Sequence, residues 1–201
     1  GSFDRTIAGI RYLRDAGISV QTNTTLTACN TDVVYTMPSF ITELGIHRMS
    51  MNLYIPAGTT AFREELTLSY TACANLLPIL QKSAQKAHVE FFWYSPIPVC
   101  IFNPLAHGLG NKNCAACDGL ISIAPDGSIL PCSSYNEPIG NILEQDFLNL
   151  WFSERAQWFK NKLYAPDFCK SCSAFTACQA ACPLYWKHNT YEEIITCRRH
   201  K

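Results

Sequence analysis

Apolar residues in the first half of the chain recur in turn with helical spacing and with strand spacing. They predict helices over residues 3–13, 33–44 and 66–80 and strands over residues 18–27, 49–55 and 89–94. Gly17 stands where the first helix would end in a left-handed residue. Pro38 lies inside the second helical pattern, so that helix either starts late, with proline in its first turn, or kinks. Strands joined by helices form βαβ crossovers, which predict a parallel sheet.

The periodic pattern weakens after residues 103–113, which are rich in turn-forming residues and mark a predicted boundary. Residues 120–123 and 128–130 flank an Ala-Pro-Asp-Gly turn, which predicts a hairpin with Gly127 in the left-handed conformation. One amphipathic helix is predicted near residues 147–160. Beyond it, cysteines replace apolar residues as the organising element of the sequence.

The composition excludes several classes of protein. Apolar residues make up 48% of the 201 residues and charged residues 16%, a mixture too apolar for a disordered chain. Basic and acidic side chains number 16 each, so no basic surface for nucleic acid is expected. No stretch approaches the length of an apolar membrane span, and the first residues lack a signal-peptide pattern. We therefore expect no membrane partner and a cytoplasmic location.

Cysteine stands out, because eight of the 11 cysteines lie between residues 114 and 197. Their spacing is C-x2-C-x14-C, a gap of 36 residues, C-x2-C-x5-C-x3-C and then x14-C. Eight thiolates form two sets of four, the ligand count of two 4Fe–4S clusters or of two structural zinc ions. Disulfides are disfavoured in a chain without an export signal. Cys182 and Pro183 give the C-x3-C-P ending of two-cluster ferredoxins, in which the last cysteine ligates the other cluster.

This spacing resembles the seven-cysteine signature of SPASM domains, the C-terminal auxiliary-cluster domains of radical S-adenosylmethionine (SAM) enzymes. The residues that carry the resemblance are Cys117, Gly127, Cys132, Cys169, Cys172, Cys178, Cys182 and Cys197. The sequence around them, over residues 123–132 and 140–142, is similar to that of the family as well. Residues 1–5 and 13–17 resemble the later βα units of a radical SAM partial barrel, so the resemblance covers nearly the whole chain.

The resemblance implies a fold and two domains. The expected fold class is α/β, with residues 1–105 forming the C-terminal part of a partial parallel βα (TIM-like) barrel. Residues 106–201 would follow as an irregular, cysteine-rich α+β SPASM domain. Two or three βα units are too few to close a barrel by themselves, which is consistent with a portion of a larger enzyme.

The resemblance also implies the ligand sets of two 4Fe–4S clusters. In the family, one auxiliary cluster takes the cysteines that match Cys117, Cys132 and Cys182, and an upstream cysteine completes it. Cys114 fits that upstream place, with Cys100 as the alternative. The second cluster then takes the remaining cysteines, which are Cys169, Cys172, Cys178 and Cys197.

By resemblance, the chain is the C-terminal portion of a radical SAM/SPASM enzyme. Its clusters would support radical modification of a peptide, a protein or a small biosynthetic substrate such as a tetrapyrrole precursor. SAM and a reductant such as ferredoxin or flavodoxin are expected for the parent protein, an oxidoreductase or maturase. The family's SAM-cleaving loop, C-x3-C-x2-C, is absent from these 201 residues, so this chain alone is not expected to cleave SAM. The alternative is a non-catalytic module, either a ferredoxin-like electron carrier or a zinc-stabilised binding domain.

Other residues receive simpler interpretations, and no catalytic residue is identified. Cys29, Cys73 and Cys100 are predicted to pack as small core residues. His107 is predicted to be a solvated or hydrogen-bonding loop residue, and the four tryptophans to be core or cluster-shielding residues. Ser133 stands where sulfatase-maturing members have aspartate, which argues against that reaction.

Overall fold

A computed structural model describes residues 1–199 and has a mixed α/β fold. The chain divides into two compact units. The first unit holds residues 1–54 and 65–95, and the second holds residues 55–64 and the chain from residue 96 onward. The predicted domain boundary between residues 105 and 106 stays a prediction.

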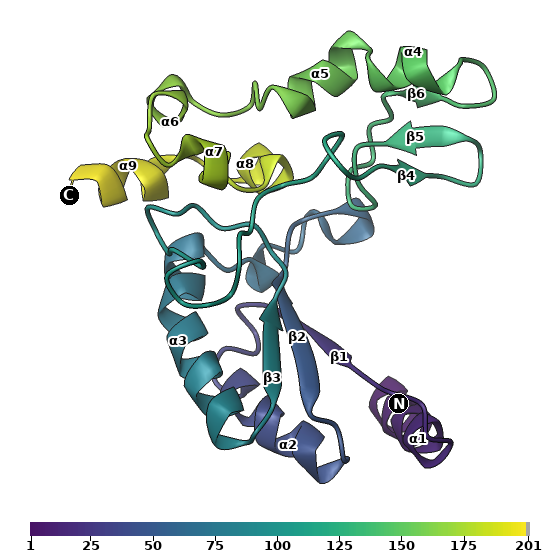
Figure 1. Cartoon of the computed structure of the whole chain (residues 1–201), viewed down its shortest axis with the longest axis vertical. Helices are drawn as coiled ribbons and strands as arrows, with labels where there is room; N and C mark the ends of the chain where they lie inside the picture. Colours follow the sequence, from purple (N-terminus) through teal and green to yellow (C-terminus); the bar gives the residue numbers. More distant parts are fainter. Residues whose placement is uncertain (200–201) are drawn as a thin grey trace. The chain divides into compact units, whose positions relative to one another are not determined.

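The first unit is built around a three-stranded parallel sheet in the order β1-β2-β3 (Figure 1). Its elements are α1 (Ser2–Asp15), β1 (Thr22–Leu26), the 3-10 helix η1 (Val34–Thr36), α2 (Met37–Glu43), β2 (Arg48–Leu53), α3 (Tyr70–Lys86) and β3 (Glu90–Trp93). In the register of the sheet, Thr24 pairs with Met51, and Met51 pairs with Trp93. The parallel sheet expected from the alternation of helices and strands is confirmed.

The core of the first unit lies between the central strand and its helices. Met49, Met51 and Leu53 alternate along β2 and are buried, as strand periodicity requires. The buried side of α3 is formed by Tyr70, Cys73, Leu77, Leu80 and Ala84. Pro38 stands in the first turn of α2, where a missing N–H costs nothing, so the helix starts late rather than kinking.

The second unit consists of a small sheet and a series of short helices. In chain order, the 3-10 helices η2 (Gly58–Thr60) and η3 (Glu64–Leu66, at the border of the units) are followed by β4 (Ser122–Ile123), β5 (Ser128–Leu130), β6 (Gly140–Asn141), α4 (Phe147–Trp151), α5 (Glu154–Lys160), α6 (Asp167–Lys170), α7 (Phe175–Cys178), α8 (Pro183–His188) and α9 (Glu192–Arg199). The sheet is antiparallel, and the predicted hairpin is formed by β4 and β5 with Gly127 at φ +82°.

One predicted helix of this unit is wrong in extent, because residues 147–160 form two helices, α4 and α5. The Ser153 side chain accepts a hydrogen bond from the Ala156 N–H at 3.2 Å, which caps a new helix where the first one ends. Apolar periodicity continues across this break, since Leu150 and Phe159 are both buried. Spacing alone therefore does not reveal the interruption.

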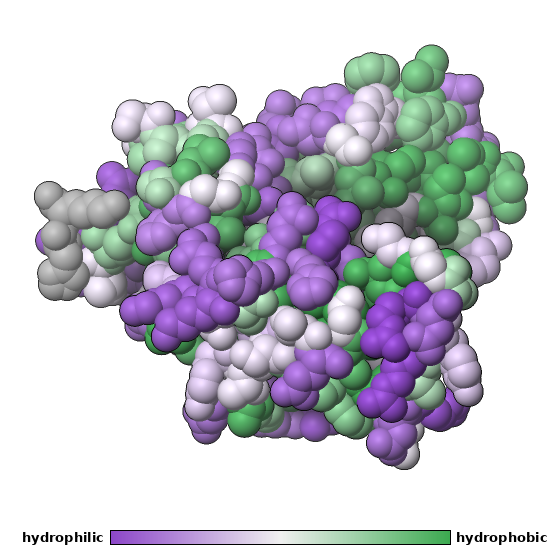
Figure 2. All heavy atoms as spheres, turned by 60° about the horizontal axis from the view of Figure 1, so that its bottom comes forward, coloured by the Kyte–Doolittle hydropathy of each residue, from purple (hydrophilic) through white to green (hydrophobic). Residues whose placement is uncertain are grey.

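The surface of the second unit carries apolar side chains around the hairpin. Figure 2 shows hydrophobic residues gathered over the part that carries β4–β6 and α4 in Figure 1. Ile123, Leu143 and Leu148 are among the exposed apolar residues there.

Among residues 1–199, no helix combines the length and the apolar composition that a membrane crossing requires.

Candidate metal centre

The first predicted thiol set gathers at the core of the second unit. Cys117 belongs to that core and is fully buried. Cys114, Cys132 and Cys182 pack against the same core. The ring of Trp158 also packs against it, and the ring of Phe159 is buried within it. Residues from three separate parts of the chain are therefore brought together, and Cys182 comes from the cysteine-rich run whose other members lie elsewhere. Their ligation of a cluster stays a prediction.

Burial disfavours the thiolate form of Cys117 and Cys182. It raises the pKa of Cys182 to about 12, and the neighbouring thiols Cys114 and Cys132 act in the same direction. Burial also raises the pKa of Cys117 to about 11, while Lys160 opposes the shift. Only the thiolate is a metal ligand, so metal binding to this set would release protons.

A buried lysine borders the first set, and sequence reasoning missed it. Lys162 is 4% exposed, and its ammonium donates to the Cys114 carbonyl at 3.3 Å and to the Asp118 carboxylate at 3.0 Å. It holds the backbone of one predicted ligand and adds positive charge beside it. Four anionic thiolates would be partly balanced by such a charge. A lone lysine in the turn after α5 gives no sequence signal of this role.

Three of the four members of the second predicted set line a cavity of 470 Å³ in the second unit. Cys169, Cys172 and Cys178 all line this cavity. Burial raises the pKa of Cys169 to about 11, and the thiols of Cys178 and Cys172 contribute to the rise. Cys197 does not line the cavity, and its thiol instead donates to the Cys100 carbonyl at 2.6 Å. The structure thus brings three members of this set together and places the fourth beside Cys100.

A backbone donor also reaches this second set. The Val99 N–H donates to the sulfur of Cys178 at 3.4 Å. Hydrogen bonds to ligand sulfurs are among the factors that set the reduction potential of an iron–sulfur cluster. The Val99 side chain carries no functional group, so only its position next to Cys100 could have suggested the contact.

A short left-handed segment separates Cys178 from Cys182. Gln179, Ala180 and Ala181 have φ values of 51°, 56° and 61°, in the region that side chains rarely adopt. Three such residues in succession reverse the chain sharply, so the cysteine before them serves the cavity and the cysteine after them faces the core. The local backbone explains how neighbours in sequence join different sets.

Two aromatic side chains hold this left-handed segment in place. The Tyr164 hydroxyl lies 3.0 Å from the Gln179 carbonyl and 3.2 Å from the Ala181 carbonyl. The Trp186 indole N–H donates to the Ala180 carbonyl at 2.5 Å. Burial raises the pKa of Tyr164, and the thiols of Cys114, Cys182 and Cys178 contribute, so the phenol lies near both sets. Sequence reasoning missed Tyr164, which is one of nine tyrosines without a motif.

The two metals that the sequence allowed make different demands on the spacing of their ligands. A zinc site needs all its sulfurs about 2.3 Å from a single ion. Four thiolates on a 4Fe–4S cluster bind four different iron atoms and are held further apart. Within residues 1–199, no group of three cysteine, histidine, aspartate or glutamate side chains is found that could hold one metal ion.

The remaining cysteines and the loop histidine give mixed outcomes. Cys73 is fully buried, as predicted for a core residue. The same prediction is wrong for Cys29, which is exposed and donates to the Glu65 carbonyl at 3.3 Å, because it lies in a turn after β1. Cys100 is partly buried and lines the second set's cavity. His107 is exposed and stacks on Phe102 at 4.4 Å between ring centroids.

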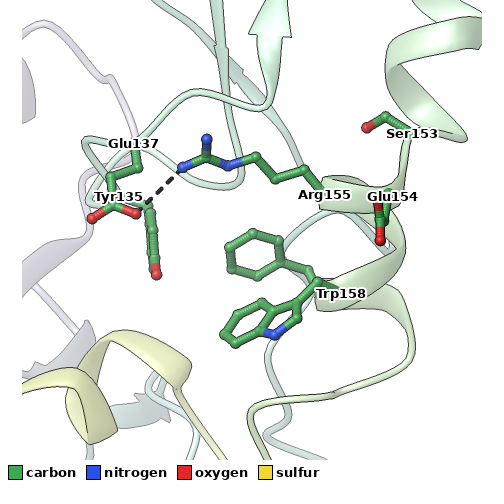
Figure 3. Close-up of a pocket in the computed structure, with 7 residues that line it drawn as sticks. Tyr135, Glu137, Ser153, Glu154, Arg155 and Trp158 are labelled. Atoms are coloured by element: carbon green, nitrogen blue, oxygen red, sulfur yellow. Dashed lines mark hydrogen bonds and ion pairs between the residues drawn. The ribbon is translucent and has the colours of Figure 1, made fainter.

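A second cavity of the same unit, of 520 Å³, contains no thiol. Figure 3 shows Arg155 extending toward Glu137, with Tyr135 and Trp158 alongside. The guanidinium lies 3.4 Å from the Glu137 carboxylate, which Lys187 also contacts. The charges of Glu137 and Arg155 are thus paired with each other. The cavity adjoins the first set, because Tyr135, Trp158 and Phe159 line it and also belong to or pack against the core of that set. The Tyr135 N–H donates to the Cys132 carbonyl at 3.1 Å.

Comparisons with known proteins find an iron–sulfur domain match and related sequences and folds. A model of the SPASM family, described as an iron–sulfur cluster-binding domain, matches residues 111–173. The chain is 25% identical over 190 residues to an AdoMet-dependent heme synthase of Methanosarcina barkeri, covering 83% of this chain and 50% of that protein. A protein of the same name from Nitratidesulfovibrio vulgaris is 24% identical over 193 residues, covering 89% and 53%. The chain spans about half the length of these relatives.

Solved structures share the fold. Streptococcus suis SuiB, bound to its precursor peptide SuiA, has a TM-score of 0.66 at 18% identity and matches 93% of this chain and 46% of its own. The enzyme anSMEcpe with bound AdoMet has a TM-score of 0.62 at 15% identity, with coverage of 98% and 59%. Residues 111–173 thus match a SPASM domain, described as an iron–sulfur cluster-binding domain, and the chain is similar over most of its length to two AdoMet-dependent heme synthases, of which it covers the C-terminal portion.

Proposed function

We propose that this chain holds two auxiliary 4Fe–4S clusters of a radical SAM/SPASM enzyme. The first cluster is held by Cys114, Cys117, Cys132 and Cys182, and the second by Cys169, Cys172, Cys178 and Cys197. The observation that supports the proposal is that the members of the first set gather at one core, while three members of the second set line a cavity and the fourth, Cys197, contacts Cys100 beside it. The iron–sulfur domain match over residues 111–173 supports the identity of the metal.

The chain's own residues prepare both sites for this cofactor. A bound 4Fe–4S cluster supplies one-electron transfer. The cysteines lose their protons and provide four thiolates to each site, which leaves no open position for a substrate. Lys162 holds the Cys114 carbonyl and offsets negative charge at the first site. The Val99 N–H donates to Cys178 at the second site. The buried rings of Phe159 and Trp186 limit the access of water.

The whole protein is proposed to modify its substrate by radical chemistry, with this chain in the supporting role. The first unit would then be the last βα units of a partial barrel, with SAM bound elsewhere in the parent protein. A peptide or protein substrate is supported by the neighbour SuiB, which is bound to a precursor peptide. A tetrapyrrole is supported by the relatives named AdoMet-dependent heme synthase. Ferredoxin or flavodoxin would be the reductant.

Metal analysis of the chain, purified without oxygen, tests the cofactor. We expect a brown protein with about eight irons and eight sulfides per chain, from two four-iron clusters. A colourless protein with two zinc ions and no sulfide would overturn the proposal in favour of a zinc-stabilised module.

Two alanine variants test the assignment of ligands. Cys114→Ala should remove only the first cluster, because its chain neighbours serve that cluster alone. Cys182→Ala should empty the first site and also disorder the run that carries the second, since Cys182 follows Cys178 directly after the left-handed segment. Iron and sulfide are counted in each variant, and proteolysis reports local order. Loss of the second cluster alone in Cys182→Ala would replace the crossed assignment by a sequential one.

A further inference from the structure

The second thiol set has a fifth cysteine beside it. Cys100 lines the same 470 Å³ cavity as Cys169, Cys172 and Cys178. The core that gathers the first set does not include Cys100. The sequence suggested Cys100 as the alternative to Cys114 at the first site. The structure instead places Cys100 at the second site. Five thiols are available where a four-iron cluster takes four.

Cys100 and Cys197 meet at this cavity. The Cys197 thiol donates to the backbone carbonyl of Cys100 at 2.6 Å, so the two residues are in direct contact. Cys100 lines the cavity, whereas Cys197 does not. Cys197, which the family pattern assigns as the fourth ligand, thus contacts Cys100, which the pattern does not include but which lines the cavity.

The backbone around Cys100 is fixed against the second set. The preceding residue, Val99, donates its N–H to the sulfur of Cys178 at 3.4 Å. The N–H groups of Ile101 and Phe102 donate to the Pro98 carbonyl at 2.9 Å and 3.0 Å, which closes a turn around Cys100. The turn therefore keeps Cys100 one residue from a direct contact with a predicted ligand.

We propose that Cys100 is an alternative fourth ligand of the second cluster and exchanges with Cys197. This inference rests on the proposed function, in which the second site holds a 4Fe–4S cluster. In the exchange, the iron–sulfur bond to Cys197 breaks and a bond to Cys100 forms. Cys100 gives up its thiol proton and Cys197 takes one, so neither net charge nor oxidation state changes. The fourth iron stays ligated by cysteine in both forms.

Alanine variants of the two cysteines test the exchange, because alanine, unlike serine, offers no ligand atom. A four-iron cluster with three cysteine ligands loses its fourth iron on mild oxidation and gives the EPR signal of a three-iron cluster. We expect this signal in the double variant Cys100→Ala/Cys197→Ala and in neither single variant. A signal in Cys197→Ala alone, or in Cys100→Ala alone, would overturn the exchange. So would a double variant without the signal.

Alkylation of the anaerobic holoprotein provides a second measurement in case the double variant does not fold. In Cys197→Ala we expect iodoacetamide to label Cys100 at least about tenfold more slowly than after the cluster is removed by a chelator with an oxidant and the thiols are reduced again, because a ligated thiolate is not available to the reagent. The exposed Cys29 is the internal control, labelled equally in both states. Equal labelling of Cys100 with and without the cluster would contradict the proposal.

The wild-type chain separates this inference from the proposed function. A wild-type preparation without iron and sulfide would contradict the proposed function itself. A preparation with about eight irons, combined with a three-iron signal in Cys197→Ala, would remove only the role of Cys100.

Discussion

At the scale of single residues, the assignment of each cysteine depends on side chains and amides that carry no motif. Tyr164 and Trp186 fix three carbonyls between Cys178 and Cys182 and so hold the turn that divides the two sets. The Val99 N–H reaches one sulfur of the second set. The cysteines are the predicted ligands, and these neighbours fix the backbone that carries them.

Tyr164→Phe should loosen the left-handed segment without unfolding the protein. The change leaves the partly buried carbonyls of Gln179 and Ala181 without the Tyr164 hydroxyl, at a cost of about 1–3 kcal/mol. Amide hydrogen exchange over residues 179–186 should therefore become about tenfold faster or more. The control is Tyr12→Phe, which removes the hydroxyl of a tyrosine that is 76% exposed. Equal exchange rates in the two variants would show that the phenol does not hold the segment.

Val99→Pro should lower the reduction potential of the second cluster. Proline removes the N–H that donates to the Cys178 sulfur, and this bond stabilises the more electron-rich reduced cluster. A neutral hydrogen bond contributes about 1 kcal/mol, which for one electron corresponds to about 40 mV. Val99→Ala keeps the N–H and is the matched control. Potentiometry followed by EPR measures the shift, and an unchanged potential in Val99→Pro would exclude a role for this amide.

At the scale of elements, the hairpin of β4 and β5 shows how much one turn residue can determine. Gly127 has φ +82°, and a Cβ built there would lie 2.6 Å from Asn141 Oδ1 and 2.7 Å from Leu143 Cγ. The Asn141 amide cannot easily move, because its nitrogen donates to the Asp126 carbonyl at 2.9 Å and its oxygen accepts from the Leu143 N–H at 2.8 Å. Conformation and space both require glycine.

Gly127→Ala should therefore destabilise the second unit by about 2–4 kcal/mol, from left-handed strain plus overpacking. Gly119→Ala is the control, since the nearest atom to its Cβ would be the Ala115 Cβ at an ordinary 4.0 Å. Limited proteolysis of the holoproteins compares the two variants. Cleavage between residues 120 and 145 should appear at a lower protease concentration in Gly127→Ala, and equal resistance of the two variants would count against a strained turn.

The elements that the sequence predicts well are those whose residues bury one face. Strand β2 and helix α3 follow from apolar spacing because the sheet and its helices share one core. Helices α6–α9 were not predicted, because each is short and is stabilised by tertiary contacts rather than by an apolar face with helical spacing. The two ligand sets came from the resemblance to the SPASM signature, and their ligation stays a prediction. The contacts of Val99, Lys162 and Tyr164 depend on tertiary approach and leave no pattern in the sequence.

At the scale of the whole molecule, the two units have different sources of stability. The first unit has a parallel sheet with fully buried side chains such as Met51 and Trp93. The second unit has strands of two or three residues, and most of its helices are shorter than eight residues. Such short helices are marginal by themselves. Many of the contacts that join them lie around the two thiol sets.

Removal of the clusters should consequently unfold the second unit and spare the first. Ligation free energy is also folding free energy where no preformed site persists without the metal. After anaerobic treatment with an iron chelator and an oxidant, followed by reduction of the thiols, protease cleavage should begin between residues 111 and 199. Hydrogen exchange of the central strand, residues 48–53, should stay within about twofold of the holoprotein, because its protection comes from its own sheet and core. The same chelator without oxidant leaves intact clusters in place and serves as the control. Loss of protection in strand 48–53 together with the second unit would mean that the two units unfold as one. An apo form with unchanged cleavage would mean that the apolar core around Cys117 and Phe159 is sufficient by itself to fold the second unit.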